Sequence, residues 1–249
     1  MISNNVTKGR SINHSELIMG IAKYNSISGL IKVFENPSKE DFDDIAISIM
    51  QNFSIRKVEA DSYGIRNVHY DIIELEFYLY NKTTNDVPTY NRDCLAGQWF
   101  LHRSGVDIAF ETKHDGNELI QFCGILIRGL KKYVDEVPVA YIGGSQRCCF
   151  ELFNNCKTYP ELLSDENKTD ISIYKSKRVR ISFDEGKDTE FRYFVPILSS
   201  DWEKPRIAVF EKKIGSEYFV LKDKKSIKYA DSVTIDENGV VEGTLVYPR

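Results

Sequence analysis

The chain has 249 residues, a formal net charge of −4 and 42% hydrophobic residues, which allows one large core, or a core with an appendage. No apolar run approaches the roughly 20 residues that cross a bilayer, so we expect no membrane segment. The five cysteines are odd in number and form no C-x-x-C pair, which indicates reduced thiols and a cytoplasmic location.

The first part of the chain predicts an extension followed by a helix. Residues 1–36 should pack on the main body and include a short amphipathic stretch at 16–22. Ser38 follows a proline as an N-cap, and Asp41 stands three residues later, where a helix begins. The helix should bury one stripe of apolar residues at helical spacing: Phe42, Ile45, Ala46, Ile49, Met50 and Phe53.

The rest of the chain alternates mostly as strands. A strand pair, 55–59 and 68–80, precedes a polar loop at 81–93, and a short helix is expected at 148–153. Other strands are expected at 98–102, 105–110, 119–130, 178–183, 191–197, 206–212, 217–222, 232–236 and 240–246. We therefore predict an α/β (α+β) fold, with flanking helices on a curved, largely antiparallel sheet. Three parts are expected: an extension (1–36), a main domain (37–205) and a small β appendage (206–249).

The strand-like run at 72–80 carries two carboxylates. Side chains alternate along a strand, so Glu74, Glu76 and Tyr78 should share one face. The opposite face should enter the core through Ile73, Leu75, Phe77 and Leu79. Two carboxylates on one face repel each other unless something neutralises them. The run is therefore either an edge strand with a solvated acidic face or part of a functional site.

Further polar residues stand among apolar ones downstream. A buried-strand pattern at 122–130 delivers one arginine, Arg128, and the segment 97–110 carries His102 and Asp107. With Ser104 these last two could suggest a Ser/His/Asp triad. We reject that interpretation, because the three residues are too close in sequence and Ser104 is not in a nucleophile-elbow context. The histidines and cysteines lack metal-ligand spacing, so no metal site is predicted.

Five stretches, taken in order, resemble the alkyladenine (3-methyladenine) DNA glycosylase family. That family has a strand of the form E-T-E-A-Y-L, and residues 74–79 read E-L-E-F-Y-L. Its V-L-L-R-A-L strand is similar to I-L-I-R-G-L at 125–130, and its G-P-x-K-L-C segment is similar to G-G-S-Q-R-C at 143–148. An arginine-bearing strand and an R-F-Y-V strand resemble 178–181 and 191–195. The similarity runs from about residue 37 to about 200.

The resemblance implies roles for five residues. Glu76 would activate a water that attacks the sugar carbon of a flipped nucleotide, and Arg128 would orient that water. Tyr78 and His102 would stack on the extruded base, and Asp107 would accept a hydrogen bond from it. No cofactor is implied. Three of these residues also have a structural interpretation: Glu76 could simply pair with Arg128, Tyr78 could be a core or interface residue, and His102 a core histidine.

Some of the family's features are missing from this chain. The loop at 81–92 contains no histidine to touch the base, and the segment 100–107 is short for a hairpin that wedges into a duplex. The acidic balance also leaves only local basic clusters for phosphate contacts. Two functions stay open. One is a divergent N-glycosidase that acts on a modified purine in DNA, or in a nucleoside or nucleotide-like small molecule. The other is a non-catalytic binder of a nucleotide or modified base, which would act as a sensor or inhibitor in host–parasite conflict.

Overall fold

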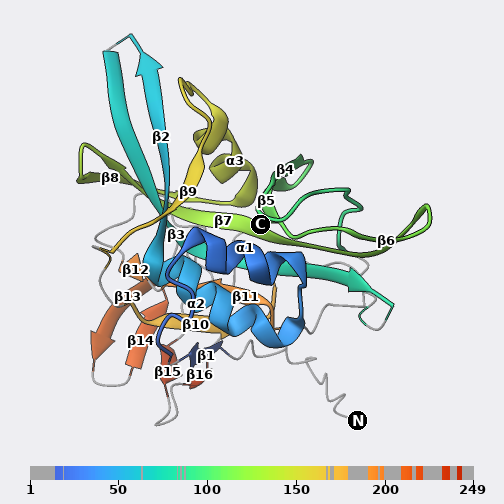
Figure 1. The fold of residues 1–249 in the computed structure, drawn as a ribbon. Coiled ribbons are helices and arrows are strands. Elements are labelled where there is room, and N and C mark those ends of the chain that lie inside the picture. The colour runs from blue at the N-terminus through green and yellow to red at the C-terminus, as the bar shows by residue number, and fades with distance from the viewer. Residues whose placement is uncertain are drawn as a thin grey trace, which may run out of the picture.

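The fold is a large, open, mostly antiparallel sheet with few helices, as the computed structural model shows (Figure 1). The structure describes residues 15–18, 20–62, 64–82, 84, 86, 88–166, 168, 171–178, 190–195, 197–198, 209–214, 217–220, 232–235 and 240–242. Within them lie a short 3-10 helix, Lys39–Asp41, and three α-helices: α1 (Ile27–Glu35), α2 (Phe42–Asn52) and α3 (Ser145–Phe153). The predicted mixed α/β class with an antiparallel sheet is confirmed at this level.

The described strands belong to one sheet. The first eight are β1 (Ser15–Ile18), β2 (Phe53–Asp61), β3 (Gly64–Asn81), β4 (Trp99–His102), β5 (Gly105–Ala109), β6 (Lys113–Asp115), β7 (Glu118–Val134) and β8 (Val137–Gly143). The others are β9 (Glu161–Ser164), β10 (Ile173–Ser176), β11 (Arg192–Phe194), β12 (Ile197–Leu198), β13 (Val209–Ile214), β14 (Glu217–Val220), β15 (Ser232–Ile235) and β16 (Val240–Glu242).

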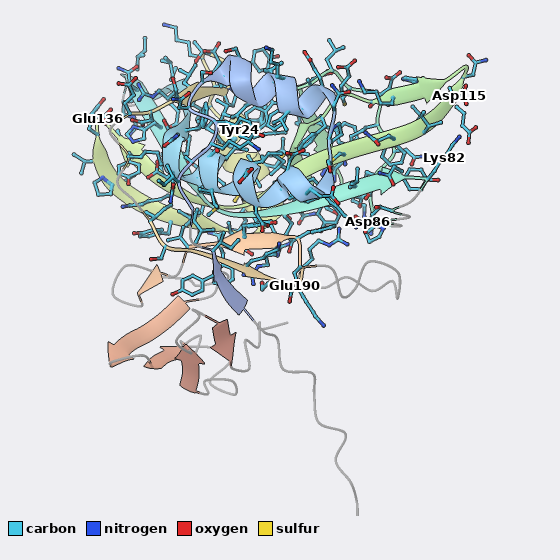
Figure 2. All side chains as sticks on the ribbon, turned by 60° about the horizontal axis from the view of Figure 1, so that its bottom comes forward. Tyr24, Lys82, Asp86, Asp115, Glu136 and Glu190 are labelled. Carbon is cyan, nitrogen blue, oxygen red and sulfur yellow. The ribbon has the colours of Figure 1, made fainter. Side chains whose placement is uncertain are left out.

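The strand order places β3 and β7 at the centre of the main body. The order is β12-β13-β14-β15-β16-β1-β10-β11-β3-β7-β5-β4, with β2 and β9 beside β3 and with β6 and β8 beside β7. Only the β12–β13 pair among the described strands is parallel. Figure 2 shows the length of the two central strands, with Lys82 and Asp115 at one end of the sheet and Glu136 at the other.

Helix α2 buries the predicted stripe against the sheet. All six stripe residues are fully buried, although Phe53 lies beyond the helix and begins β2, and the Phe42 ring stacks on Phe77 of β3 with centroids 4.1 Å apart. Burial of each large side chain contributes roughly 1.5–3 kcal/mol. The predicted cap is shifted: Ser38 accepts from the Glu40 N–H and begins the 3-10 turn, and α2 follows from Phe42.

The N-terminal segment contains more structure than the sequence predicted. Helix α1 was not expected, although Ser26 caps it by accepting a hydrogen bond from the Gly29 N–H. Its Leu30 and Phe34 are buried in the same core as α2. The stretch predicted to be amphipathic begins as strand β1, which pairs with both β10 and β16. The predicted domain boundaries at residues 37 and 206 stay predictions, and residues 179–183 of one expected strand lie outside the described residues.

Two irregularities interrupt the pairing of β3 with β7. Ile72 pairs with Leu130, Glu74 with Gly129 and Leu75 with Ile127. Ile73 is therefore an extra residue in β3, and Arg128 is an extra residue in β7. Because a bulge changes which side chains face the core, Ile72 rather than Ile73 joins Leu75, Phe77 and Leu79 in the core cluster. Ile73 is itself buried, as predicted, at 5% exposure, but it lies outside that cluster.

Candidate functional site

The face of β3 opposite the core carries a row of polar side chains. Glu76 pairs in register with Arg192 of β11 on one side and with Leu126 of β7 on the other, and Leu126 pairs with Asp107 of β5. Directly paired residues lie on the same face of a sheet. Four neighbouring strands therefore place Glu76, Asp107 and Arg192 on one surface. β3 is not an edge strand, so the alternative of an exposed acidic edge is excluded.

Glu76 and Arg128 meet on this face, as expected. The Arg128 Nη1 donates to Glu76 Oε2 at 3.2 Å, and the Tyr78 hydroxyl donates to the same oxygen at 2.8 Å. Arg128 is the extra residue of β7 in the bulge, which turns its side chain towards the carboxylates. Burial and the neighbouring Glu76 carboxylate raise the pKa of Tyr78 well above its ordinary value, so its hydroxyl keeps the proton that it donates.

Glu74 has a different set of partners. Its Oε1 accepts from Arg128 Nε at 3.2 Å and from Arg192 Nε at 2.7 Å, while Arg192 Nη1 donates to Ser176 Oγ at 3.2 Å. The two glutamates are only 1% and 0% exposed, so neither is solvated. Two arginines neutralise two carboxylates here. We call Glu74, Glu76, Tyr78, Arg128 and Arg192 the Glu76 cluster.

A buried ion pair closes over Tyr78. Arg178 binds Asp86 through two contacts of 2.7 Å, and its guanidinium lies 4.5 Å from the centre of the Tyr78 ring. Asp86 also accepts from the Leu79 N–H and from the Thr89 hydroxyl, which ties the loop after β3 back to that strand. The ring face predicted to stack on a base is therefore covered by an arginine in this conformation.

His102 and Asp107 also come together, with an unexpected third partner. His102 Nε2 lies 2.9 Å from Asp107 Oδ1, and Arg92 Nη1 donates to Asp107 Oδ2 at 2.6 Å. The Ser104 backbone N–H donates to His102 Nδ1, so Nε2 carries the proton that Asp107 accepts. We call Arg92, His102 and Asp107 the Asp107 cluster.

Aromatic rings surround the Asp107 cluster. The Tyr90 and Phe100 rings lie 4.5 Å and 5.5 Å from the His102 ring, so neighbouring rings already pack against the imidazole. The Ser104 hydroxyl bonds to Tyr90 and not to His102, which agrees with the rejection of a triad. Tyr90 keeps 39% of its surface exposed and is the more accessible aromatic ring.

Sequence reasoning missed four members of the site: Asp86, Arg92, Arg178 and Arg192. Two of their ion pairs join residues about a hundred positions apart, which no local pattern reveals. Arg192 stood in a stretch quoted for the family resemblance and next to aromatic residues, which is the only signal that could have found it. Arg92 stood in a loop without periodicity.

No protein-family model matches the chain, and a search of the curated proteins finds no similar sequence. Across the described part of the chain, no helix is long and apolar enough to cross a membrane. The same part holds no group of three or more His, Cys, Asp or Glu residues placed to bind a metal ion. The assigned roles therefore depend on the geometry of the two clusters and on the sequence resemblance.

Proposed function

We propose that the protein is an N-glycosidase, related to the alkyladenine DNA glycosylases, that hydrolyses the bond between a purine-type base and its sugar. The observation that carries the proposal is the contact between Glu76, Arg128 and Tyr78 on the polar face of β3. A general base must lie within hydrogen-bond reach of the proton it takes, and it must be held in one orientation. Arg128 and Tyr78 supply that orientation.

The chemistry would need few groups. Glu76 takes a proton from a water whose oxygen attacks the anomeric carbon, and the electron pair of the glycosidic bond leaves with the base. Arg128 holds the water and balances the charge of the carboxylates. Tyr78 would have to exchange Arg178 for the base, because the guanidinium now lies over its ring. A purine would fit this exchange, since an aromatic face accepts any planar heterocycle.

A second function is favoured by the burial of the site. Glu76 is 0% exposed, and its Oε2 already accepts two hydrogen bonds, so a water must displace a partner to reach that oxygen. A protein that only binds a nucleotide or modified base would keep the same self-paired carboxylates without needing a reactive water. Such a protein would act as a sensor or an inhibitor.

Release of free base separates the two functions. Duplex DNA, single-stranded DNA and nucleosides that carry hypoxanthine or an N-methylated purine are incubated with the protein, and the free base is measured by mass spectrometry. The N-glycosidase releases base, and Glu76→Gln lowers the rate at least about 100-fold. Binding to at least one substrate without release by the wild-type protein would establish the binder instead. If duplex DNA is the substrate, its binding should weaken steeply as salt rises.

A further inference from the structure

We propose that Arg92 reads the ligand: its Nη2 donates to a carbonyl oxygen on the edge of an uncharged heterocycle. The inference rests on the proposed function for the position of the heterocycle near Tyr78, and it specifies the class of ligand. It assigns recognition to a loop residue rather than to Asp107 and His102, which the sequence resemblance had suggested.

The first support is the position of the guanidinium. A Cβ built on Gly124 would lie 1.9 Å from Arg92 Nη1 and 2.6 Å from Asp107 Oδ2, so the missing side chain leaves the space that both groups use. Gly124 pairs in register with Tyr78 on β3 and with Ala109 on β5. Arg92 therefore lies over the strand position directly beside Tyr78, on the polar face.

The second support is the donor that remains. Arg92 Nε donates to the Tyr90 carbonyl at 3.1 Å, Nη1 donates to Asp107, and the guanidinium packs on the Phe100 ring at 4.5 Å. The described residues offer no hydrogen bond to Nη2, although the Arg92 side chain is only 1% exposed. Nη2 is not among the fully buried, unpartnered atoms of the described residues, so water reaches it and a ligand acceptor can replace that water.

The third support is that the neighbouring acceptors are already occupied. Asp107 gives one oxygen to Arg92 and the other to His102, and both ring nitrogens of His102 have partners. A ligand N–H would find these groups engaged, whereas a ligand acceptor finds Nη2. The edge that this side of the site recognises is therefore an acceptor edge, as when an arginine reads the oxygen and ring nitrogen of a guanine.

The fourth support is the balance of charge. Each of the four buried carboxylates around this site is paired with at least one arginine: Glu74 and Glu76 with Arg128, Asp86 with Arg178, and Asp107 with Arg92. None is left over to attract a cationic, N-alkylated base. A donor at a carbonyl would also stabilise the negative charge that a neutral base acquires as the glycosidic bond breaks. The departing base would then take a proton from solvent.

Binding of three nucleosides tests the inference without turnover. The Glu76→Gln protein is titrated by calorimetry with inosine, which has a carbonyl at the key edge, with adenosine, which has an amino group there, and with cationic 1-methyladenosine. Inosine should bind at least about tenfold more tightly than the other two, as expected for one charge-assisted hydrogen bond. Arg92→Lys keeps the positive charge but removes Nη2, and should weaken inosine binding about tenfold. Arg56→Lys, on the half-exposed Arg56 of β2, is the matched control and should change nothing.

Three results would overturn the inference: tighter or equal binding of adenosine or 1-methyladenosine, inosine binding that Arg92→Lys leaves unchanged, or no binding of any nucleoside. If Arg92→Lys does not fold, the selectivity of the Glu76→Gln protein alone decides. Failure of the proposed function is a separate outcome. Arg92-dependent binding of inosine without any base release keeps the inference and removes the enzyme, while base release with no role for Arg92 does the reverse.

Discussion

Two buried charge clusters lie at different places on the same sheet. Their charged side chains form hydrogen bonds with different kinds of group. In the Glu76 cluster, every hydrogen bond described above joins side chains, and one arginine stands on a bulge. The other, which we call the Glu59 cluster, contains Lys57, Glu59, Tyr70, Lys132 and Glu151. Each cluster has two cations, two carboxylates and a tyrosine, so their charges are matched.

The Glu59 cluster holds secondary structure together. Lys57 Nζ donates to the backbone carbonyls of Glu151 and Asn154 at 2.6 and 3.0 Å, where helix α3 ends. A lysine at this place satisfies carbonyls that have no partner within the helix and complements the helix dipole. Lys132 joins Glu151 of α3 to Glu59 of β2. The comparison teaches that buried charge of equal size can hold helix and strands together in one place and orient the side chains of a proposed site in another.

Lys57→Met should have the largest effect on stability and no effect on the ligand site. It removes a fully buried ammonium and leaves Glu59 and two helix carbonyls short of a donor. We expect the free energy of unfolding to fall by about 4 kcal/mol. Urea denaturation measures that change, and nucleoside binding at a temperature where the variant is folded should match the wild type. Weakened binding would mean that the two clusters are not independent.

Arg192→Lys should lower the free energy of unfolding less than Lys57→Met does, but it should also disturb the proposed ligand site. A lysine cannot contact Glu74 and Ser176 with two nitrogens as Arg192 does. Glu74 then draws Arg128 away from Glu76. We expect a loss of about 2 kcal/mol in unfolding free energy and a clear drop in base release. An unchanged rate in a variant that shows this stability loss would make Arg192 a purely structural residue.

Gly124→Ala sharpens the assignment of Arg92. The added methyl group would lie 1.9 Å from Arg92 Nη1, so the guanidinium must move. Overpacking of this kind costs typically about 1–2 kcal/mol, and inosine binding should fall with it. In an Arg92→Ala background the same change should cost less, which a double-mutant cycle measures. Additive costs would show that the two positions are not coupled.

The smallest effect concerns pH and the Glu59 cluster. Burial alone would raise the pKa of Glu59, but hydrogen bonds and charge from Lys57 and Lys132 outweigh it and lower the pKa below the ordinary 4.5. The carboxylate therefore contributes stability above its unfolded pKa, and this contribution is lost as pH falls through the folded value. Urea unfolding between about pH 3 and 6 should show that the free energy of unfolding of Glu59→Gln falls less steeply with decreasing pH than that of the wild type. Equal slopes would contradict the assignment.

The sequence predicted those parts of the site that depend on short-range alternation. Glu74, Glu76 and Tyr78 share a face because side chains alternate along β3, and His102 meets Asp107 across the β4–β5 hairpin. The place of Ile72 rather than Ile73 in the core cluster was not predicted, because the bulge depends on two strands together. Arg192 and Asp86 were missed because their partners are distant in sequence. Helix α1 was missed although Ile27, Leu30, Ile31 and Phe34 recur at helical spacing after the Ser26 cap.

A matched pair of isosteric variants tests the central claim most directly. Glu76→Gln and Glu59→Gln each remove one carboxylate from a cluster of equal charge, so both should lower the free energy of unfolding, by about 3 kcal/mol. Only one of them should affect function. We predict that Glu76→Gln lowers base release at least about 100-fold, while Glu59→Gln, assayed where it is folded, keeps the wild-type rate. Equal rates in the two variants would contradict the account, because Glu76 would then be a structural carboxylate like Glu59.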